Sequence, residues 1–163
     1  MVRRAAVGDE AALREIRLRA LGDAPEAFGS TLERERARTT ADWQRWFAPG
    51  ATFLASHGDR PIGLVAGSHD PGDAAIIHLQ AMWVDPVARG SGTADALVSA
   101  LLEWAAAENA REVRLTVIAE NRRAIGLYAR HGFRLTAAES VRERDGAAEC
   151  QMVRLLGRAD SGN

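Results

Sequence analysis

The segment Arg89-Gly90-Ser91-Gly92 places an arginine and two glycines between an apolar run and an amphipathic one. Such a turn can bind a phosphate, because backbone N–H groups of the first helical turn point outward and the helix dipole adds positive charge there. The two glycines would let the backbone approach a ligand closely, and Arg89 would add a charge-assisted contact. Without further context, an ordinary strand-to-helix turn explains these residues equally well.

Two familiar nucleotide-binding loops do not fit this segment. The dinucleotide fingerprint G-x-G-x-x-G needs a glycine at position 95, where the sequence has Asp95. The P-loop needs a lysine, and all 21 basic residues of the chain are arginine. The lack of lysine also excludes Schiff-base chemistry on the chain itself. An anion site here would therefore rest on glycines, backbone N–H groups and a helix N-terminus.

A second segment, residues 121–133, has the letters NRRAIGLYARHGF. Asn121 is a favourable N-cap residue, and Gly132 near the end of the segment is typical of helix C-termini, so we predict a helix between them. The broad face of this helix comprises Ala124, Leu127, Tyr128 and His131. The simplest structural interpretation is a short helix packed on a core, with Tyr128 as an amphipathic aromatic residue.

Taken together, the two segments resemble the GNAT acetyltransferase superfamily. The pattern R-G-x-G-x-A is followed about 30 residues later by N-x-x-A-x-x-L-Y-x-x-x-G-F. The letters HLQAMWVDP are similar to the central strand of that family. The letters RLRALGDAPEAFGSTL are similar to a segment that precedes the acceptor-site helix in many bacterial members. The resemblance covers nearly the whole chain, and its strength lies in the order and spacing of the motifs.

The resemblance implies an α/β (α+β) fold with a single mixed, mostly antiparallel sheet, flanked by helices and splayed at its central parallel strands. It also implies that acetyl-CoA is the cofactor. Backbone N–H groups of Arg89, Gly90, Ser91, Gly92, Thr93 and Ala94 would hold the coenzyme A pyrophosphate. Met82, Trp83 and Val84 would offer backbone groups to the pantetheine arm, and one of their N–H groups would polarise the thioester carbonyl. Asn121 would bind the cofactor through its side chain.

The implied reaction is direct attack of an amine on the acetyl thioester, without an acyl-enzyme. Tyr128 would protonate the leaving thiolate, and a phenol with an ordinary pKa of about 10 suits that role because it is protonated at neutral pH. Cys150, the single cysteine, is not needed; we expect it to be a small buried side chain in a late strand.

The general base is poorly marked in the sequence. His78, Gln80 and Met82 alternate onto one face of the central strand, unless a bulge shifts the register. Family members often carry a glutamate on this strand, and residues 74–84 contain none. His78 could take the amine proton directly or through water, because histidine exchanges protons near neutral pH. A histidine at a strand end with no catalytic role is an equally good interpretation.

The acceptor region is equally open. Glu33 and Glu35 could bind or deprotonate a cationic amine, or they could lie on a solvated helix face. The aromatic residues of this region either line the acceptor pocket or close a core; they are Phe28, Trp43, Trp46 and Phe47. We expect Phe28, Glu33 and Gln80 to contact the substrate.

We expect that substrate to be a primary amine of a small molecule or an amino-acid-like metabolite, or alternatively of a protein. Two further alternatives are a non-catalytic acyl-CoA sensor or structural subunit, and a transferase that uses a longer acyl-CoA or an aminoacyl-tRNA. Tyr128 argues against the sensor, because a protein that no longer catalyses the reaction would not need to retain the tyrosine that acts as the general acid.

One domain must position these residues, and we predict that it spans residues 1–156, followed by a frayed tail at 157–163. Strands are predicted at 2–6, 52–57, 61–69, 74–84, 113–118, 133–140 and 148–155, and helices at about 9–21, 92–109 and 122–130. The first helix would bury Leu13, Ile16, Ala20 and Leu21. Residues 23–47 are predicted to form a loop and a second helical region. The order βααβββαβαββ, with a βαβ crossover in the middle, predicts a mixed sheet.

Bulk composition limits the partners. The chain has 163 residues, 47% hydrophobic and 26% charged, with a net charge of −1, so no global basic field favours nucleic acid. Its four histidines are scattered and no C-x-x-C occurs, so we predict no metal site. No apolar run reaches the length of a membrane span, and the N-terminus lacks a signal peptide's apolar stretch, which predicts a cytoplasmic protein. Family members often form homodimers, but nothing in this sequence fixes the oligomeric state.

Overall fold

A computed structural model describes residues 1–157, and within them seven strands form one mixed sheet in the order β1-β2-β3-β4-β5-β7-β6. The strands are β1 (Val2–Arg4), β2 (Ala51–His57), β3 (Arg60–His69), β4 (Ile76–Val84), β5 (Glu112–Ile118), β6 (Arg134–Val141) and β7 (Ala148–Leu155). The helices are α1 (Glu10–Asp23), α2 (Leu32–Arg36), α3 (Thr40–Gln44), α4 (Thr93–Ala107) and α5 (Arg122–Arg130), with 3-10 turns η1 (Pro25–Ala27) and η2 (Pro86–Ala88).

The expected fold class is confirmed, with one refinement in the region of residues 23–47. That region forms the turn η1 and two helices of five residues each, α2 and α3, rather than one helix. Thr31 caps α2 and Thr39 caps α3 through their side chains, so two caps lie within ten residues and each helix stays short. Most of the predicted tail, residues 158–163, lies outside the described residues, and the domain bounds stay a prediction.

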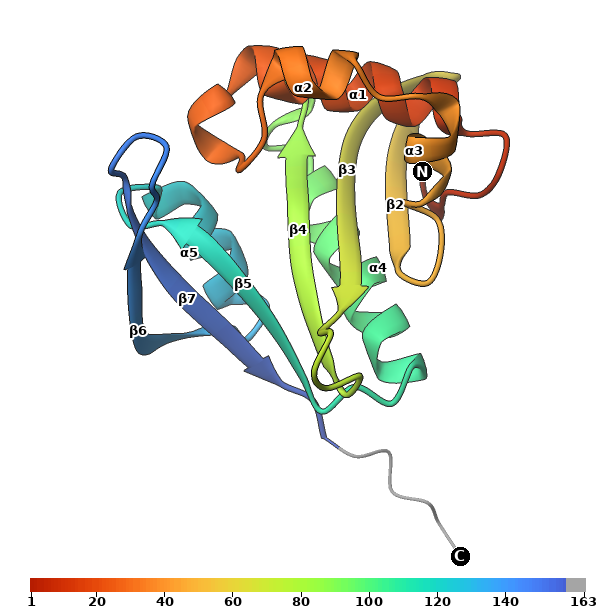
Figure 1. The fold of residues 1–163 in the computed structure, drawn as a ribbon. Helices are drawn as coiled ribbons and strands as arrows, with labels where there is room; N and C mark the ends of the chain where they lie inside the picture. The colour runs from red at the N-terminus through yellow and green to blue at the C-terminus, as the bar shows by residue number, and fades with distance from the viewer. Residues whose placement is uncertain (158–163) are drawn as a thin grey trace, which may run out of the picture.

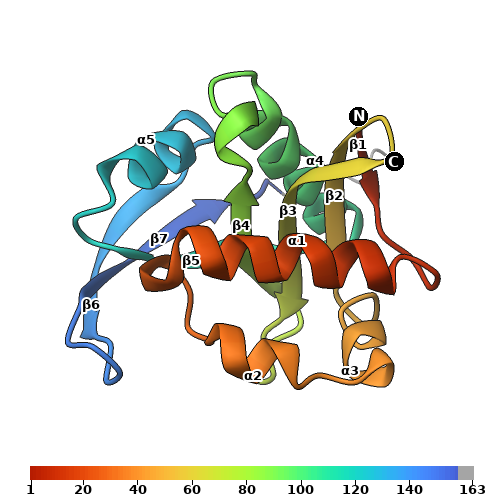
Figure 2. The same cartoon turned by 90° about the horizontal axis from the view of Figure 1, so that it is seen from above.

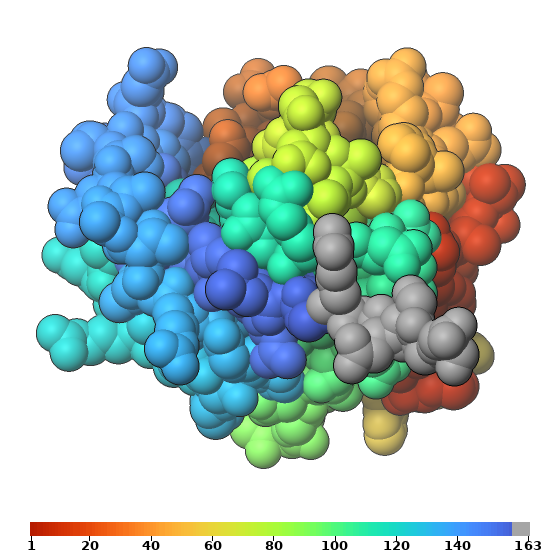
Figure 3. Space-filling model, turned by 90° about the horizontal axis from the view of Figure 1, so that it is seen from below, coloured from red at the N-terminus to blue at the C-terminus, as the bar shows by residue number. Residues whose placement is uncertain are grey.

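Two hydrophobic cores lie on opposite faces of the sheet (Figures 1 and 2). Helices α1, α2 and α3 cover one face, where the predicted stripe of α1 is buried together with Trp43 and Phe47. Helix α4 packs on the other face, and α5 covers β5 and β7 there. Seen from below, the C-terminal hairpin and the N-terminal residues occupy opposite sides of the molecule (Figure 3).

A bulge in β4 decides which side chains face which core. Ala66 pairs with Gln80 while Leu64 pairs with Trp83, so β4 has one more residue than β3 in this interval. The extra residue places Ala81 in the left-handed region at φ 57°, which is uncommon for an alanine.

The bulge overturns the simple alternation along this strand. Before it, His78 and Gln80 face the α1 and α2 side; after it, Met82 packs into the core on the α4 side. Met82 therefore does not share a face with His78 and Gln80.

The central parallel strands separate soon after they begin. β4 and β5 pair only through Ile76–His78 with Glu112–Arg114, and beyond these residues they diverge (Figure 1). The facing edges of the two strands then have no ladder partner, so their backbone groups are available to a ligand. The expected splay is confirmed, and several of the predicted site residues line the cavity between these strands. None of the helices within residues 1–157 combines the length and the hydrophobicity that a membrane-spanning segment needs.

Candidate active site

The turn before α4 has the backbone geometry of an anion-binding cradle. Gly90 and Gly92 have φ values of 82° and 83°, a backbone conformation that side chains other than glycine rarely adopt. Among the described residues, the backbone N–H groups of Gly90, Gly92, Thr93 and Ala94 donate to no protein acceptor. The N–H groups of Arg89 and Ser91 are already used, by Pro86 and Ala88. Four of the six predicted N–H groups are therefore free to bind an anion.

The cradle opens into a cavity of about 580 Å³. A Cβ at Gly90 or Gly92 would meet no atom within 4 Å, so the space above the turn is open. The cavity is lined on one side by Met82, Trp83 and Val84 and on the other by Asn121, Ala124 and Leu127, and its basic residues are Arg89, Arg123 and Arg130. All the predicted cofactor residues except Ser91 and Thr93 therefore line one cavity.

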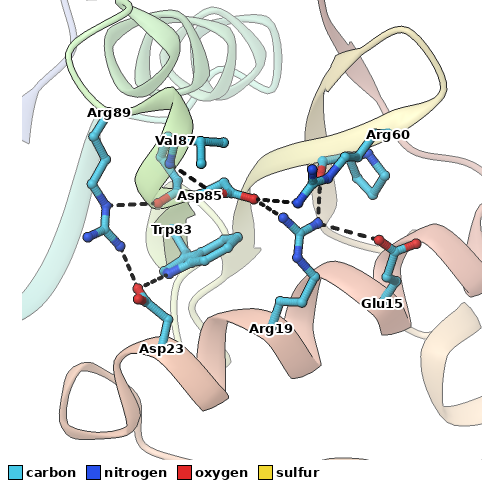
Figure 4. Close-up of polar contacts among 10 residues, drawn as sticks. Glu15, Arg19, Asp23, Arg60, Trp83, Asp85, Val87 and Arg89 are labelled. Atoms are coloured by element: carbon cyan, nitrogen blue, oxygen red, sulfur yellow. Dashed lines mark hydrogen bonds and ion pairs between the residues drawn. The ribbon is translucent and has the colours of Figure 1, made fainter.

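The Arg89 side chain is engaged elsewhere than predicted (Figure 4). Its guanidinium donates to Asp23 at the end of α1, at 2.5 Å, and to the Val84 carbonyl at 3.1 Å. Asp23 also accepts from the Trp83 indole at 2.9 Å, and this bond, together with Arg89, holds the pKa of Asp23 below its ordinary value. Arg89 therefore fastens the cradle to α1, and its charge is already paired.

Asp85 fixes the turn between β4 and the cradle. It is only 4% exposed, and it accepts from Arg19, from Arg60 at 3.3 Å and from the Val87 backbone N–H at 3.1 Å (Figure 4). The last bond caps η2, as expected of an aspartate before a proline. Because its carboxylate is held on both sides, the direction in which the chain leaves β4 is fixed.

Between β4 and β5 lies a smaller cavity of about 130 Å³ that shares residues with both larger ones. Tyr128 lines it, is 6% exposed and packs edge-on against Phe133 at 5.7 Å between ring centroids. Burial raises the pKa of the Tyr128 phenol well above its ordinary value. The phenol therefore carries its proton at every pH near neutrality.

Asn121 lies where the smaller cavity, which we call the gap between β4 and β5, meets the cavity beside the cradle, which we call the cradle cavity. Its side-chain oxygen accepts from the Ala124 backbone N–H at 3.1 Å and so caps α5. Only the amide nitrogen, which donates, is left for a ligand. The geometry permits the predicted cofactor contact as a donor only.

On the far side of the gap is a cavity of about 830 Å³, which we call the acceptor cavity; His78 and Gln80 both line it. His78 Nε2 lies 2.7 Å from Asp70 Oδ2, and this hydrogen bond lowers the pKa of Asp70. Because Asp70 occupies Nε2, His78 Nδ1 remains for a second partner. Asp70 therefore orients the His78 imidazole at the wall of the acceptor cavity.

The aromatic and acidic residues predicted for this region divide between cavity and core. Phe28 lines all three cavities and Trp46 lines the acceptor cavity, whereas Trp43 and Phe47 are core residues. Glu33 is exposed on α2 and does not line the cavity. The buried glutamate of this helix is Glu35.

Several charged residues at the site were missed by the sequence analysis. The acceptor cavity is also lined by Arg17, Arg34, Arg38, Arg142 and Glu149, none of which was predicted, and by Glu35, which was considered. Arg17 had a visible signal, because its position falls on the buried stripe of α1 beside Leu13 and Ile16. A charged residue at a core position of an amphipathic helix predicts a partner or a ligand.

The comparisons with known proteins agree with this geometry. The family model described as "Acetyltransferase (GNAT) family" matches residues 13–133. A mycothiol acetyltransferase of Geodermatophilus obscurus is 35% identical over 129 residues, which cover 77% of this chain and 41% of that protein. An L-2,4-diaminobutyric acid acetyltransferase of Nocardia farcinica is 29% identical over 139 residues, covering 80% of this chain and 72% of that protein. The chain thus spans about two fifths of the length of the mycothiol acetyltransferases that it matches.

Among solved structures, the Salmonella typhimurium protein yncA, determined with its cofactor acetyl-CoA, superposes with a TM-score of 0.79. The match covers 100% of this chain and 97% of that one at 18% identity, so it shows a shared fold.

Proposed function

Since the chain belongs to the GNAT acetyltransferase family, we propose that it transfers the acetyl group of acetyl-CoA directly to a primary amine of a small molecule or an amino-acid-like metabolite. The observation that carries the proposal is the series of three adjoining cavities. The anion cradle opens into one, Tyr128 lines the narrow middle one, and the third lies on the far side of the splayed strands. A donor and an acceptor could thus approach from opposite faces of the sheet.

The residues of the cradle fit the proposed cofactor. The four free N–H groups of residues 90–94 and the N-terminal end of α4 would hold the pyrophosphate. Arg123, which lines the same cavity and forms no ion pair within the described part of the chain, would add a cation. The unpaired edge of β4 at Met82 would hydrogen-bond an extended pantetheine arm. When bound, acetyl-CoA supplies an acetyl group activated as a thioester.

Two side chains would carry out the proton transfers of the reaction. Tyr128 holds its phenolic proton in the gap, where it is available to a departing thiolate. His78, oriented by Asp70, would take the proton of the incoming amine at Nδ1, directly or through water. Glu35 suits that task poorly, because its carboxylate lies 2.6 Å from Arg38 Nε and is already ion-paired.

The names of the relatives favour a small acceptor. Mycothiol and L-2,4-diaminobutyric acid are small molecules, and the proteins named for their acetylation match this chain over 77% and 80% of its length. The mycothiol acetyltransferases are much longer than this chain, so their acceptor does not transfer directly to it. A small acceptor is therefore part of our proposal.

The test is release of free thiol from acetyl-CoA over a panel of small primary amines, together with calorimetric binding of coenzyme A. Turnover with at least one amine, and binding to the cradle, are expected. Binding without turnover of any amine would favour a non-catalytic sensor. No binding of coenzyme A would overturn the cofactor assignment.

A further inference from the structure

Arg17 is an ionised side chain with unused donors at the wall of the acceptor cavity. It is 5% exposed, it comes from α1, and it lines the cavity. Within residues 1–157, its Nε and Nη1 have no hydrogen-bond partner. Leaving donors of a buried cation unsatisfied is costly, so a buried guanidinium with two unpartnered donor nitrogens indicates a ligand that accepts hydrogen bonds.

Two aromatic rings hold this guanidinium in place. The Arg17 Cζ atom lies 4.7 Å from the centroid of the Phe28 ring and 5.3 Å from that of Trp46. Cation–π contacts of this kind restrict the guanidinium plane and keep its fork fixed before a ligand arrives. A carboxylate oxygen of a ligand would accept a charge-assisted hydrogen bond from one of these unpartnered nitrogens.

The neighbouring carboxylate does not neutralise Arg17 fully. Glu35 is completely buried and stands between two arginines. Its nearer contact is Arg38 Nε at 2.6 Å, while Arg17 Nη2 is 3.6 Å away, beyond hydrogen-bond distance. One carboxylate shared by two guanidinium groups leaves one net positive charge at this end of the cavity. Burial lowers the pKa of Arg17, as expected of a cation that lacks a full counter-charge.

A second unsatisfied group lies at the same cavity. Ser30 Oγ is buried and has no partner among the described residues, and Ser30 lines the cavity too. Its hydroxyl can donate to an anion beside Arg17. Of the other arginines there, Arg142 is already bound to Asp145, and Arg34 is exposed at the rim.

The same cavity also has a proton acceptor on the sheet. His78, held by Asp70, lies on β4 where this strand still pairs with β5. The cavity therefore combines unpaired cationic donors from α1 with a proton acceptor from β4. A substrate with a carboxylate at one end and an amine at the other matches this combination.

Building on the proposed function, we propose that the acceptor is an amino acid in the broad sense, a primary amine with a carboxylate in the same molecule. Arg17 and Ser30 bind the carboxylate, and the amine lies toward His78. The rings of Phe28 and Trp46 hold the Arg17 guanidinium in position and so contribute to specificity.

The first experiment compares matched acceptors. L-2,4-diaminobutyrate is paired with 1,3-diaminopropane, and further α- and ω-amino acids are each paired with the amine that remains without the carboxylate. We expect kcat/KM to be at least about tenfold higher for the carboxylate member of the pairs that are used, as one charged hydrogen-bond pair provides. Equal use of both members would overturn the inference while leaving the proposed acetyl transfer intact.

The second experiment changes the fork. Arg17→Met keeps length and removes charge, Arg17→Lys keeps charge and removes the fork, and Arg14→Met on the exposed face of α1 is the control. Arg17→Met should lower kcat/KM for the amino acid at least about tenfold and change it less than about threefold for the decarboxylated partner. A purely structural role would lower both equally and would overturn the inference. If Arg17→Met does not fold, Arg17→Lys and Ser30→Ala give the same comparison.

A binding measurement separates this inference from the proposed function. Tryptophan fluorescence of the enzyme saturated with coenzyme A is titrated with each pair, and Trp46→Phe should remove the response because Trp46 lies against Arg17. Carboxylate-dependent binding without turnover would support the carboxylate site and count against acetyl transfer. Absence of both binding and turnover for every carboxylate-bearing acceptor would overturn the inference, whatever neutral amines do.

Discussion

Tyr128 and His78, the two side chains assigned to proton transfer, differ sharply in environment. The Tyr128 residue is 6% exposed, and burial raises its phenol pKa, whereas the His78 side chain is 37% exposed and bound to Asp70. A buried phenol that keeps its proton can act only as a donor near neutral pH. The exposed imidazole can exchange protons with water. The environments therefore support opposite roles for the two residues.

Tyr128→Phe should lower kcat for acetyl transfer at least about tenfold, because positioned acids commonly contribute that much or more. The KM for acetyl-CoA should stay within about twofold, since the ring packing on Phe133 is kept. Steady-state kinetics of thiol release measure both constants, and coenzyme A binding controls for folding. An unchanged kcat would remove Tyr128 as the acid.

The cradle can be tested with a pair of isosteric variants at Gly92. Asparagine and aspartate both tolerate the left-handed conformation at φ 83°, so Gly92→Asn and Gly92→Asp share the strain and the bulk and differ in charge. Gly92→Asp should raise the KM for acetyl-CoA at least about tenfold above that of Gly92→Asn, and added salt should narrow the difference. Equal KM values for the two variants would place the pyrophosphate elsewhere.

Single residues also show where sequence reasoning ends. The cradle glycines and Tyr128 could be predicted because local motifs carry them. The partner of Arg89 could not, since Asp23 is 66 residues away in the chain and only the packing of α1 beside β4 brings them together. Arg17 was detectable in principle, but its rings and its shared carboxylate come from three separate segments.

Among the secondary-structure elements, β1 and α1 are joined by an ion pair that should respond to acid. Arg3 donates to both oxygens of Asp9 at 2.8 and 2.7 Å, and these bonds lower the pKa of Asp9 to about 2. Because the folded pKa lies below the unfolded value, this stabilisation is present above about pH 4 and is lost as the pH falls toward 2.

Asp9→Asn should lower the free energy of unfolding by on the order of 1 kcal/mol above about pH 5, a modest value because Arg3 is half exposed. The difference from the unchanged protein should shrink between about pH 4 and pH 2. Urea unfolding across this pH range measures it, with Asp59→Asn in the exposed β2–β3 turn as the control. A difference that is constant down to pH 2 would show that the ion pair does not set the pKa.

Strand and helix types were predictable, but register was not. Periodicity correctly placed β4, yet the extra residue at Ala81 appears only in its pairing with β3. That one residue sends Met82 to the opposite face from His78, so the alternation expected of a strand without a bulge does not hold here. Likewise the splay of β4 from β5 came from family resemblance, because no local pattern encodes where two strands separate.

For the whole molecule, the sheet is two units that meet at three residue pairs between β4 and β5. A second connection spans the gap at the opposite end. Arg142 in the β6–β7 turn donates to the carbonyls of Glu26 and Phe28, and Arg144 donates to those of Pro25 and Ser30. The C-terminal hairpin thus holds the segment 25–30, which carries both the Phe28 wall and Ser30, against the acceptor cavity.

Arg144→Ala should loosen that segment without unfolding the protein, because both of its bonds are at the surface. We expect faster amide hydrogen exchange in residues 25–30, and a KM for the acceptor raised about two- to fivefold, while the KM for acetyl-CoA changes less. Arg134→Ala, exposed at the other end of the same hairpin, is the control. If exchange in residues 25–30 stays unchanged, the hairpin does not hold this segment, and the cavity wall is positioned by α1 and the sheet alone.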